Sequence, residues 1–236
     1  MILSHRHKFI FIRTAKTASS SLELALETLC GPDDICPPLS KHSEQAPPEE
    51  RGYIPRNHRG LFWPHWRSDA PLTQLRRDLR DLRLGRRYWN HMSAWEVRER
   101  AGADIFNRYF KFCFERNPWD RTVSAFFWQK GRIRNCPQDF ETYVRHWQVR
   151  DNFELYAIAG KPVVDFVGRF ENLEADLAKA LARVGVRDVP PLPRAKSEWR
   201  PRDQSYRDYR SYYTAETRDI VARRYAPIIE LMGYEF

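Results

Sequence analysis

The chain has 236 residues, with 40 lysines and arginines against 31 aspartates and glutamates, and a formal net charge of +9. No apolar run approaches the roughly 20 residues of a membrane-spanning helix, and the 4 cysteines lack metal-ligand spacing, which excludes both a membrane span and a cysteine-based metal site. The length suits one domain with a sizeable core or one domain with an insertion, and the basic excess suits either a polyanionic partner or simple solubility.

The first predicted element is a strand that leads through a polar loop into a helix. Phe9–Ile12 is a short apolar run of β-forming residues, typical of a strand buried on both faces of a sheet. After a loop over residues 13–21, leucine and alanine recur at helical spacing over Leu22–Leu29, and Gly31-Pro32 ends that helix. The strand begins too close to Met1 to leave room for a signal peptide, so we expect reduced cysteines and a cytoplasmic protein.

The loop between this strand and helix favours an anion. The first N–H groups of a helix lack internal partners and carry partial positive charge, and small residues let an anion approach them. Lys16 adds a full charge, and it is followed by small or hydroxyl-bearing residues: Thr17, Ala18, Ser19, Ser20 and Ser21. The loop lacks both glycines of the Walker A pattern. An ordinary helix start capped by serine or threonine explains these residues about equally well.

Residues 31 to about 90 interrupt the regular pattern. Proline, histidine and arginine are frequent there, and the aromatic residues between them argue against plain disorder. We interpret the segment as an insertion that forms a flap over a binding site, with a loop packed on the domain surface as the alternative. Leucines at helical spacing over Leu72–Leu82 predict a helix within it, whose arginines suit either solvent or an acidic ligand.

A capping box predicts the next helix. Ser93 and Glu96 have the S-x-x-E spacing, so the helix should start at Ser93 and run to Ala101, with Gly102 ending it. His91 then lies two residues before the N-cap, where the positive helix end disfavours imidazolium and leaves a neutral ring that can accept a proton. On position alone, a histidine that is hydrogen-bonded within a loop is the simpler interpretation.

Residues 109–130 repeat the opening architecture. Alternating apolar residues predict a strand that ends before Arg116, and Asn117-Pro118 is a strong helix start. Arg116 therefore lies at the carboxyl end of a strand, where ligands gather in open α/β sheets, and Ser124 lies about two turns further on. An arginine with a nearby hydroxyl suits a phosphate group. The alternative is an ion pair between this arginine and a neighbouring carboxylate, Asp120 or Glu115.

The rest of the chain continues the alternation of helices and strands. We expect helix within residues 131–160, a strand over 163–168, a helix over 173–184, and a last helix from Thr214 that Pro227 should kink or interrupt. An irregular segment from Pro190 to about Tyr213 holds basic residues that suit either an anion or solvent: Lys196, Arg200 and Arg202.

Taken together, these stretches resemble the sulfotransferase family, in particular the branch of carbohydrate sulfotransferases and many bacterial relatives. Lys16–Ser21 resembles the 5′-phosphosulfate loop of the family, and Arg116–Ser124 resembles its 3′-phosphate motif. Gly168–Leu173 and the terminal Gly233–Phe236 are similar to the downstream part of bacterial members. The resemblance spans nearly the whole chain and is weakest over residues 31–88.

The resemblance implies one α/β domain over residues 1–236, with a P-loop-like three-layer fold and a central, mostly parallel sheet flanked by helices. It makes the insertion at about 31–90 a candidate acceptor flap. It also implies 3′-phosphoadenosine 5′-phosphosulfate (PAPS) as the donor, bound by the loop at Lys16–Ser21, with no metal. Arg116 and Ser124 match the family pair that holds the 3′-phosphate. His91 stands, in chain order, where several carbohydrate members keep a catalytic histidine.

We therefore expect a PAPS-dependent sulfotransferase that moves a sulfuryl group to a hydroxyl of an acceptor, either a carbohydrate or a small metabolite. Lys16 would stabilise the leaving 5′-phosphate, and His91 would take the proton of the acceptor hydroxyl. A P-loop kinase or nucleotide hydrolase would need a Walker A loop and a carboxylate for Mg²⁺, and the sequence offers neither. The alternative is a basic nucleotide- or nucleic-acid-binding protein without transferase activity. Because the basic residues are spread along the chain among acidic ones, we expect no nucleic-acid partner.

Overall fold

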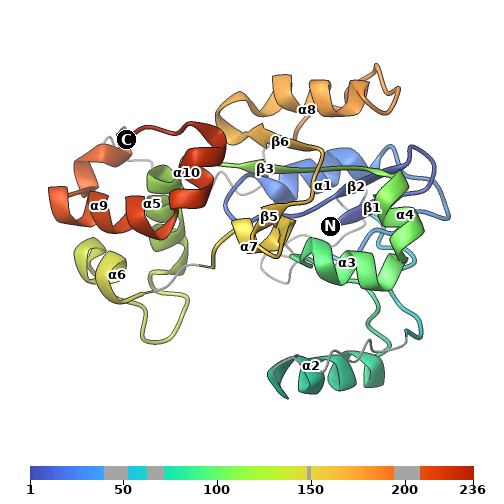
Figure 1. Ribbon diagram of the computed structural model, residues 1–236, viewed down its shortest axis with the longest axis horizontal. Helices are drawn as coiled ribbons and strands as arrows, with labels where there is room; N and C mark the ends of the chain where they lie inside the picture. Colours follow the sequence, from blue (N-terminus) through green and yellow to red (C-terminus); the bar gives the residue numbers. More distant parts are fainter. Residues whose placement is uncertain (40–52, 63–71, 148–149, 194–207) are drawn as a thin grey trace.

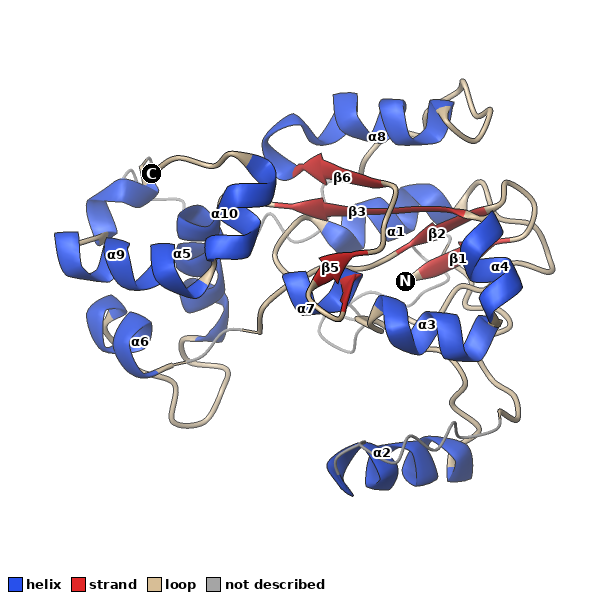
Figure 2. Cartoon of the chain, in the orientation of Figure 1, coloured by secondary structure: helices blue, strands red, loops and turns tan. Residues whose placement is uncertain are grey.

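A computed structural model describes residues 1–39, 53–62, 72–147, 150–193 and 208–236. Across these ranges, the main sheet has four strands in the spatial order β1-β2-β3-β6 (Figures 1 and 2). These strands are β1 (Ile2–Ser4), β2 (Phe9–Phe11), β3 (Phe110–Glu115) and β6 (Phe166–Arg169). β1 is antiparallel to β2, whereas β2, β3 and β6 are parallel, so the carboxyl ends of these last three meet at one edge of the sheet.

Helices cover both faces of the sheet, because side chains along its strands alternate between two apolar clusters. On one face, Phe112 and Phe114 belong to the cluster that contains residues of α1 (Ser19–Glu27) and α8 (Leu173–Ala182). On the other face, Ile10 and Cys113 belong to the cluster of α3 (Ala94–Ala101), α4 (Ala103–Arg108) and α7 (Phe153–Tyr156). In Figure 1, α8 lies above the sheet and α3 below it. This arrangement confirms the expected three-layer α/β fold with a mostly parallel sheet.

Gly168 allows β6 to lie close to β3. It pairs in register with Phe114, and a Cβ atom added to it would lie 2.5 Å from the Phe114 ring. Any larger residue would have to push the ring or the strand out of a close-packed core. The glycine that opens the bacterial-type motif therefore has a packing role.

A third apolar cluster lies beyond the sheet, at the left of Figure 1. It is formed by α5 (Pro118–Gln129), α6 (Phe140–His146), α9 (Ala215–Arg224) and α10 (Ala226–Met232). Val123, Tyr143 and Tyr225 are fully buried in it. Because α5 follows directly from β3, it joins this cluster to the edge where the parallel strands end.

Cap residues set several helix boundaries as the sequence predicts. Ser93 makes both hydrogen bonds of the capping box at α3, and Asn117 accepts N–H bonds at the start of α5. Pro227 interrupts the last helix as expected, since Tyr225 leaves helical geometry, at φ −115° and ψ 26°, between α9 and α10.

The prediction of helix within residues 131–160 is correct only for α6 and α7. Residues 131–139 form no α-helix, and β4 (Ala157–Ile158) pairs with β5 (Lys161–Pro162) in a small antiparallel hairpin. Positive φ at Gly131, Asn135 and Gly160 turns the chain away from a helical path. The next strand begins at Phe166 instead of at residue 163, because Val163 donates its N–H to the Tyr156 carbonyl. The described residues also form 3₁₀ helices at Phe170–Asn172 and Tyr209–Tyr212.

The insertion at about 31–90 is attached to the domain near both of its ends. A backbone bridge joins Leu3 to Ile35, and the Tyr88 hydroxyl donates to the Arg100 carbonyl at 3.1 Å. Between these attachments, α2 (Leu72–Arg83) lies apart from the sheet at the bottom of Figure 1. Residues 40–52 and 63–71 of the insertion lie outside the described residues, as do Lys196, Arg200 and Arg202. Over the ranges that are described, no helix combines the length and apolar character needed to cross a bilayer.

Candidate functional site

The two turns identified in the sequence meet at one edge of the sheet. β2 and β3 are parallel neighbours, with Phe11 opposite Phe112, so the segments that follow them emerge side by side. Arg116 donates from Nη1 to the Lys16 carbonyl at 3.4 Å. The turn that carries Lys16 and the turn that carries Arg116 are therefore in direct contact.

The turn at Lys16 leads into a helix end that has no side-chain cap. Lys16 and Ala18 have φ of 66° and 55°, in the left-handed region. Ala18 is the N-cap of α1 and makes no side-chain hydrogen bond, so the alternative of a serine or threonine cap is wrong. The hydrogen bond from Leu22 N–H to the Ala18 carbonyl, 3.1 Å long, opens the helix. The N–H groups of Ser19–Ser21 precede it, at the helix end where an anion binds most readily.

Some hydroxyls of this turn point into the protein instead of outward. Thr17 Oγ1 lies 2.9 Å from Thr14 Oγ1, and Ser20 Oγ accepts from Arg13 Nη2 at 3.1 Å. Arg13 is buried and also pairs with Glu23 of α1. The side chains of Thr17 and Ser20 therefore hold the shape of the turn, and in this arrangement they do not extend toward a ligand.

One face of α5 lies against both turns. The Lys16 Nζ atom is 5.5 Å from the centre of the Trp128 ring. Arg116 donates from Nε to Asp120 Oδ2 at 2.7 Å, and its Nη2 forms an ion pair with the same oxygen at 2.7 Å. Asp120, Ser124 and Trp128 are spaced four residues apart and therefore share a face of the helix. Ser124 lies on that face between the residue that contacts Arg116 and the residue that contacts Lys16.

Arg116 is 3% exposed and connects three elements. Besides its bonds to Asp120 and to the Lys16 carbonyl, its guanidinium carbon lies 4.3 Å from the centre of the Phe170 ring. The ion pair with Asp120, the alternative raised by the sequence, is therefore present. A guanidinium carries five N–H donors, and the two hydrogen bonds use one on Nε and one on Nη1, so the pair with Asp120 orients Arg116 and leaves donors for a further acceptor.

His91 lies against the start of the first turn as a neutral ring. Its Nδ1 is 3.1 Å from the Arg13 carbonyl, which can only accept, so Nδ1 carries the proton and Nε2 carries a lone pair. Burial in the first place, and then the positive charge of Arg13, lowers the pKa of His91 to about 3. The sequence predicts a neutral ring from its position before a helix, whereas burial is the main cause.

Asn152 contacts the same turn, and Glu115 contacts Asn152, although no motif indicates these contacts. Asn152 accepts from Ala15 N–H at 2.8 Å and donates to the Ala15 carbonyl at 3.1 Å. It also donates to Glu115 Oε2 at 3.1 Å, and burial raises the pKa of Glu115 to about 7. Asn152 is 137 residues from Ala15, so the sequence carries no local signal of this contact.

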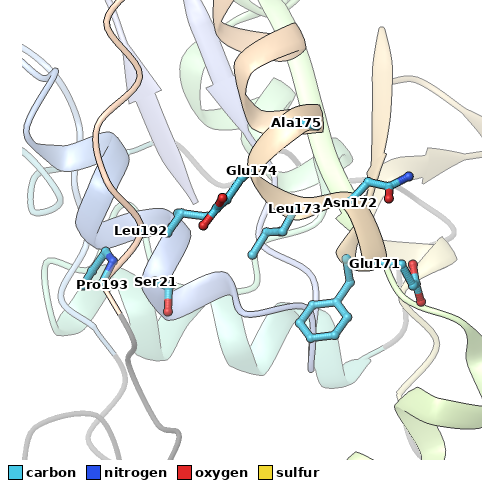
Figure 3. A pocket seen from close by; sticks show the side chains of 9 residues that line it. Ser21, Glu171, Asn172, Leu173, Glu174, Ala175, Leu192 and Pro193 are labelled. Carbon is cyan, nitrogen blue, oxygen red and sulfur yellow. The ribbon is translucent and has the colours of Figure 1, made fainter.

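A pocket of about 560 Å³ opens beside the two turns (Figure 3). Ser21 lines it from α1, and Phe170, the ring that contacts Arg116, lines it from the segment before α8. The remaining lining residues come from the start of α8 and from the segment after it: Glu171, Asn172, Leu173, Glu174, Ala175, Leu192 and Pro193. Glu171 is engaged by Asn117 N–H at 2.8 Å, which joins this wall of the pocket to the second turn.

Comparison with known proteins places the chain in a family. The model of the sulfotransferase family matches residues 1–235. A protein of Archaeoglobus fulgidus that is described only as uncharacterized is 39% identical over 100 residues, which make up 40% of this chain and 83% of that protein. No solved structure matches the chain.

Proposed function

The chain belongs to the sulfotransferase family, and from this premise we propose that it transfers a sulfuryl group from PAPS to a hydroxyl of an acceptor, either a carbohydrate or a small metabolite. The observation that carries the proposal is the contact between the two turns, in which Arg116 donates to the Lys16 carbonyl. Two cationic turns at one edge of a parallel sheet suit the two phosphate-bearing ends of one nucleotide.

In this proposal the turn at Lys16 binds the 5′-phosphosulfate and the turn at Arg116 binds the 3′-phosphate. Lys16 and the N–H groups of Ser19–Ser21 supply charge and donors to the first group. Arg116, oriented by Asp120, and the Ser124 hydroxyl supply donors to the second. The pocket beside Ser21 has a volume of about 560 Å³, which is enough to accept the adenosine.

The residues at the sheet edge fit the chemistry of the transfer. PAPS, when bound, supplies a sulfuryl group whose departure leaves added negative charge on the 5′-phosphate. Lys16 and the helix N–H groups stabilise that charge as it develops. His91 Nε2 takes the proton of the acceptor hydroxyl while the hydroxyl oxygen bonds to sulfur and the bond between sulfur and the phosphate oxygen breaks.

The low pKa of His91 fits a base that becomes effective only when the donor is bound. Burial is the main cause of this low pKa, and the positive charges of Arg13, the N-terminus and Arg150 lower it further. Arg150 donates from Nη1 to the His91 carbonyl at 3.4 Å. A bound phosphosulfate would offset the effect of these positive charges and so raise the pKa of His91 above its value in the protein without donor. Proton acceptance would then coincide with the presence of the group to be transferred.

The spent donor, 3′-phosphoadenosine 5′-phosphate (PAP), should raise the melting temperature of the protein. At 100 times its dissociation constant, a ligand adds about 2.7 kcal/mol to the free energy of unfolding, which for a chain of this length corresponds to roughly 5–10 °C. Thermal unfolding with equal concentrations of PAP, 5′-AMP and ATP makes the comparison. A shift that is largest for PAP supports the proposal, whereas no shift, or equal shifts for all three, contradicts it.

The acceptor class is tested by transfer from radiolabelled PAPS to a panel of carbohydrates and hydroxyl-bearing metabolites. Label that appears in a carbohydrate or metabolite with the wild-type protein supports the acceptor assignment. Label that appears only in phenols or lipids in the same panel would move the acceptor to another class and leave the donor assignment intact.

A further inference from the structure

Asn152, which comes from a distant part of the chain, holds the turn that carries Lys16. It is fully buried and directly precedes α7. Its Oδ1 accepts Ala15 N–H at 2.8 Å, and its Nδ2 donates to the Ala15 carbonyl at 3.1 Å. One side-chain amide therefore makes both of the hydrogen bonds that a neighbouring backbone would make to Ala15.

Glu115 fixes the orientation of that amide. Its Oε2 accepts from Asn152 Nδ2 at 3.1 Å, and Glu115 is fully buried at the end of β3. With the amide reversed, its oxygen would face the Ala15 carbonyl and the Glu115 carboxyl group. The contact therefore has one arrangement, and Glu115 ties it to the strand that leads to Arg116.

The hydrogen bonds between Asn152 and Ala15 lie directly before Lys16, a residue with a strained backbone. Lys16 follows Ala15 and has φ of 66°, a conformation that is costly for a residue with a side chain and that persists only when the surroundings impose it. After the Lys16 side chain, the Lys16 carbonyl accepts a hydrogen bond from Arg116 Nη1 at 3.4 Å. Asn152 and Arg116 thus fix the chain before and after the Lys16 side chain.

We propose that Asn152 is a positioning residue that keeps the turn at Lys16 in the shape that binds the 5′-phosphosulfate. This inference rests on the proposed function. The flanking elements have their own apolar support: Phe11 of β2 and Leu22 of α1 lie in one cluster, and Leu155 of α7 lies in the other. Loss of the amide should therefore loosen the turn before it unfolds the domain.

Hydrogen–deuterium exchange of the protein without ligand tests the contact itself. In Asn152→Ala, amides of residues 13–18 should exchange at least about tenfold faster than in the wild type, while those of β3 keep their rates. Asn152→Asp, which keeps the size but loses the amide donors, should show the same change and serves if the alanine variant fails to fold. Unchanged exchange of residues 13–18 would overturn the inference.

Asn57→Ala is the matched control for exchange and binding. Asn57 Nδ2 also donates to two carbonyls, those of Pro32 at 2.6 Å and Asp34 at 2.9 Å, but it lies in the insertion. This variant should leave the exchange of residues 13–18 and the affinity for PAP at their wild-type values. The same effects in Asn57→Ala as in Asn152→Ala would mean that general destabilisation is responsible, and would overturn the inference.

The affinity for PAP tests the positioning role. Titration calorimetry should give a dissociation constant about tenfold higher in Asn152→Ala than in the wild type. Faster exchange with an unchanged affinity would show a contact that does not position the donor, and would overturn the inference. If the wild type itself does not bind PAP, the proposed function fails, and the exchange experiment still decides whether Asn152 holds the turn.

Discussion

Replacing Lys16 by alanine should lower kcat for sulfuryl transfer by about 10²–10³-fold, the usual effect of removing one group that stabilises charge in a transition state. The backbone of the turn should survive the substitution, because its contacts come from Arg116 to the Lys16 carbonyl and from Asn152 to Ala15. The variant is therefore expected to fold, and kcat is measured with radiolabelled PAPS at saturating donor.

Lys130→Ala is the matched control for this substitution. The Lys130 Nζ atom lies 5.3 Å from the Phe126 ring centre, close to the 5.5 Å between Lys16 Nζ and the Trp128 ring. Each variant removes one lysine from an aromatic ring of α5, and only Lys16→Ala should lose transfer. Equal turnover of the two variants would exclude Lys16 from the reaction.

His91→Asn should keep donor binding and lose transfer, with kcat lowered by about 10²–10⁴-fold, the contribution typical of a general base. The asparagine amide can still donate to the Arg13 carbonyl, as Nδ1 of His91 does, but it has no basic nitrogen in the position of Nε2. The substitution therefore separates the structural hydrogen bond from the proton transfer.

Two measurements on His91→Asn decide the role of the ring. Calorimetry should give a dissociation constant for PAP within about twofold of the wild type, since the turn keeps its contacts. Turnover of labelled PAPS should fall at every pH tested between 6 and 9. Unchanged turnover would assign proton transfer to another group, and loss of PAP binding would make His91 a binding residue instead of a base.

Both strand–turn–helix elements could be predicted from the sequence because each is encoded in adjacent residues. The apolar run Phe9–Ile12 and the pair Asn117-Pro118 carry their own signals, and β2 and α5 form where those signals predict. The capping box at Ser93 likewise predicted the start of α3, with His91 two residues before the N-cap.

What the sequence could not reveal depends on contacts between distant residues. Asn152 has no motif around it and gains its place only when α7 packs beside the turn at Ala15. β1 is too short to be recognised alone and exists because Ile2–Ser4 pairs with β2. The neutral state of His91 was predicted from a helix end, but its main cause is burial, which is a property of the assembled fold.

The central claim is that the turns at Lys16 and Arg116 bind opposite ends of one nucleotide, and titration calorimetry with PAP and 5′-AMP tests it most directly. The two nucleotides differ only in the 3′-phosphate, so the ratio of their dissociation constants measures what the protein gains from that group. We expect the wild type to bind PAP about 100-fold more tightly than 5′-AMP, Arg116→Ala to lose most of this preference, and Lys16→Ala to weaken both nucleotides equally. Equal affinities of the wild type for the two nucleotides, or a preference that survives in Arg116→Ala, would contradict the account.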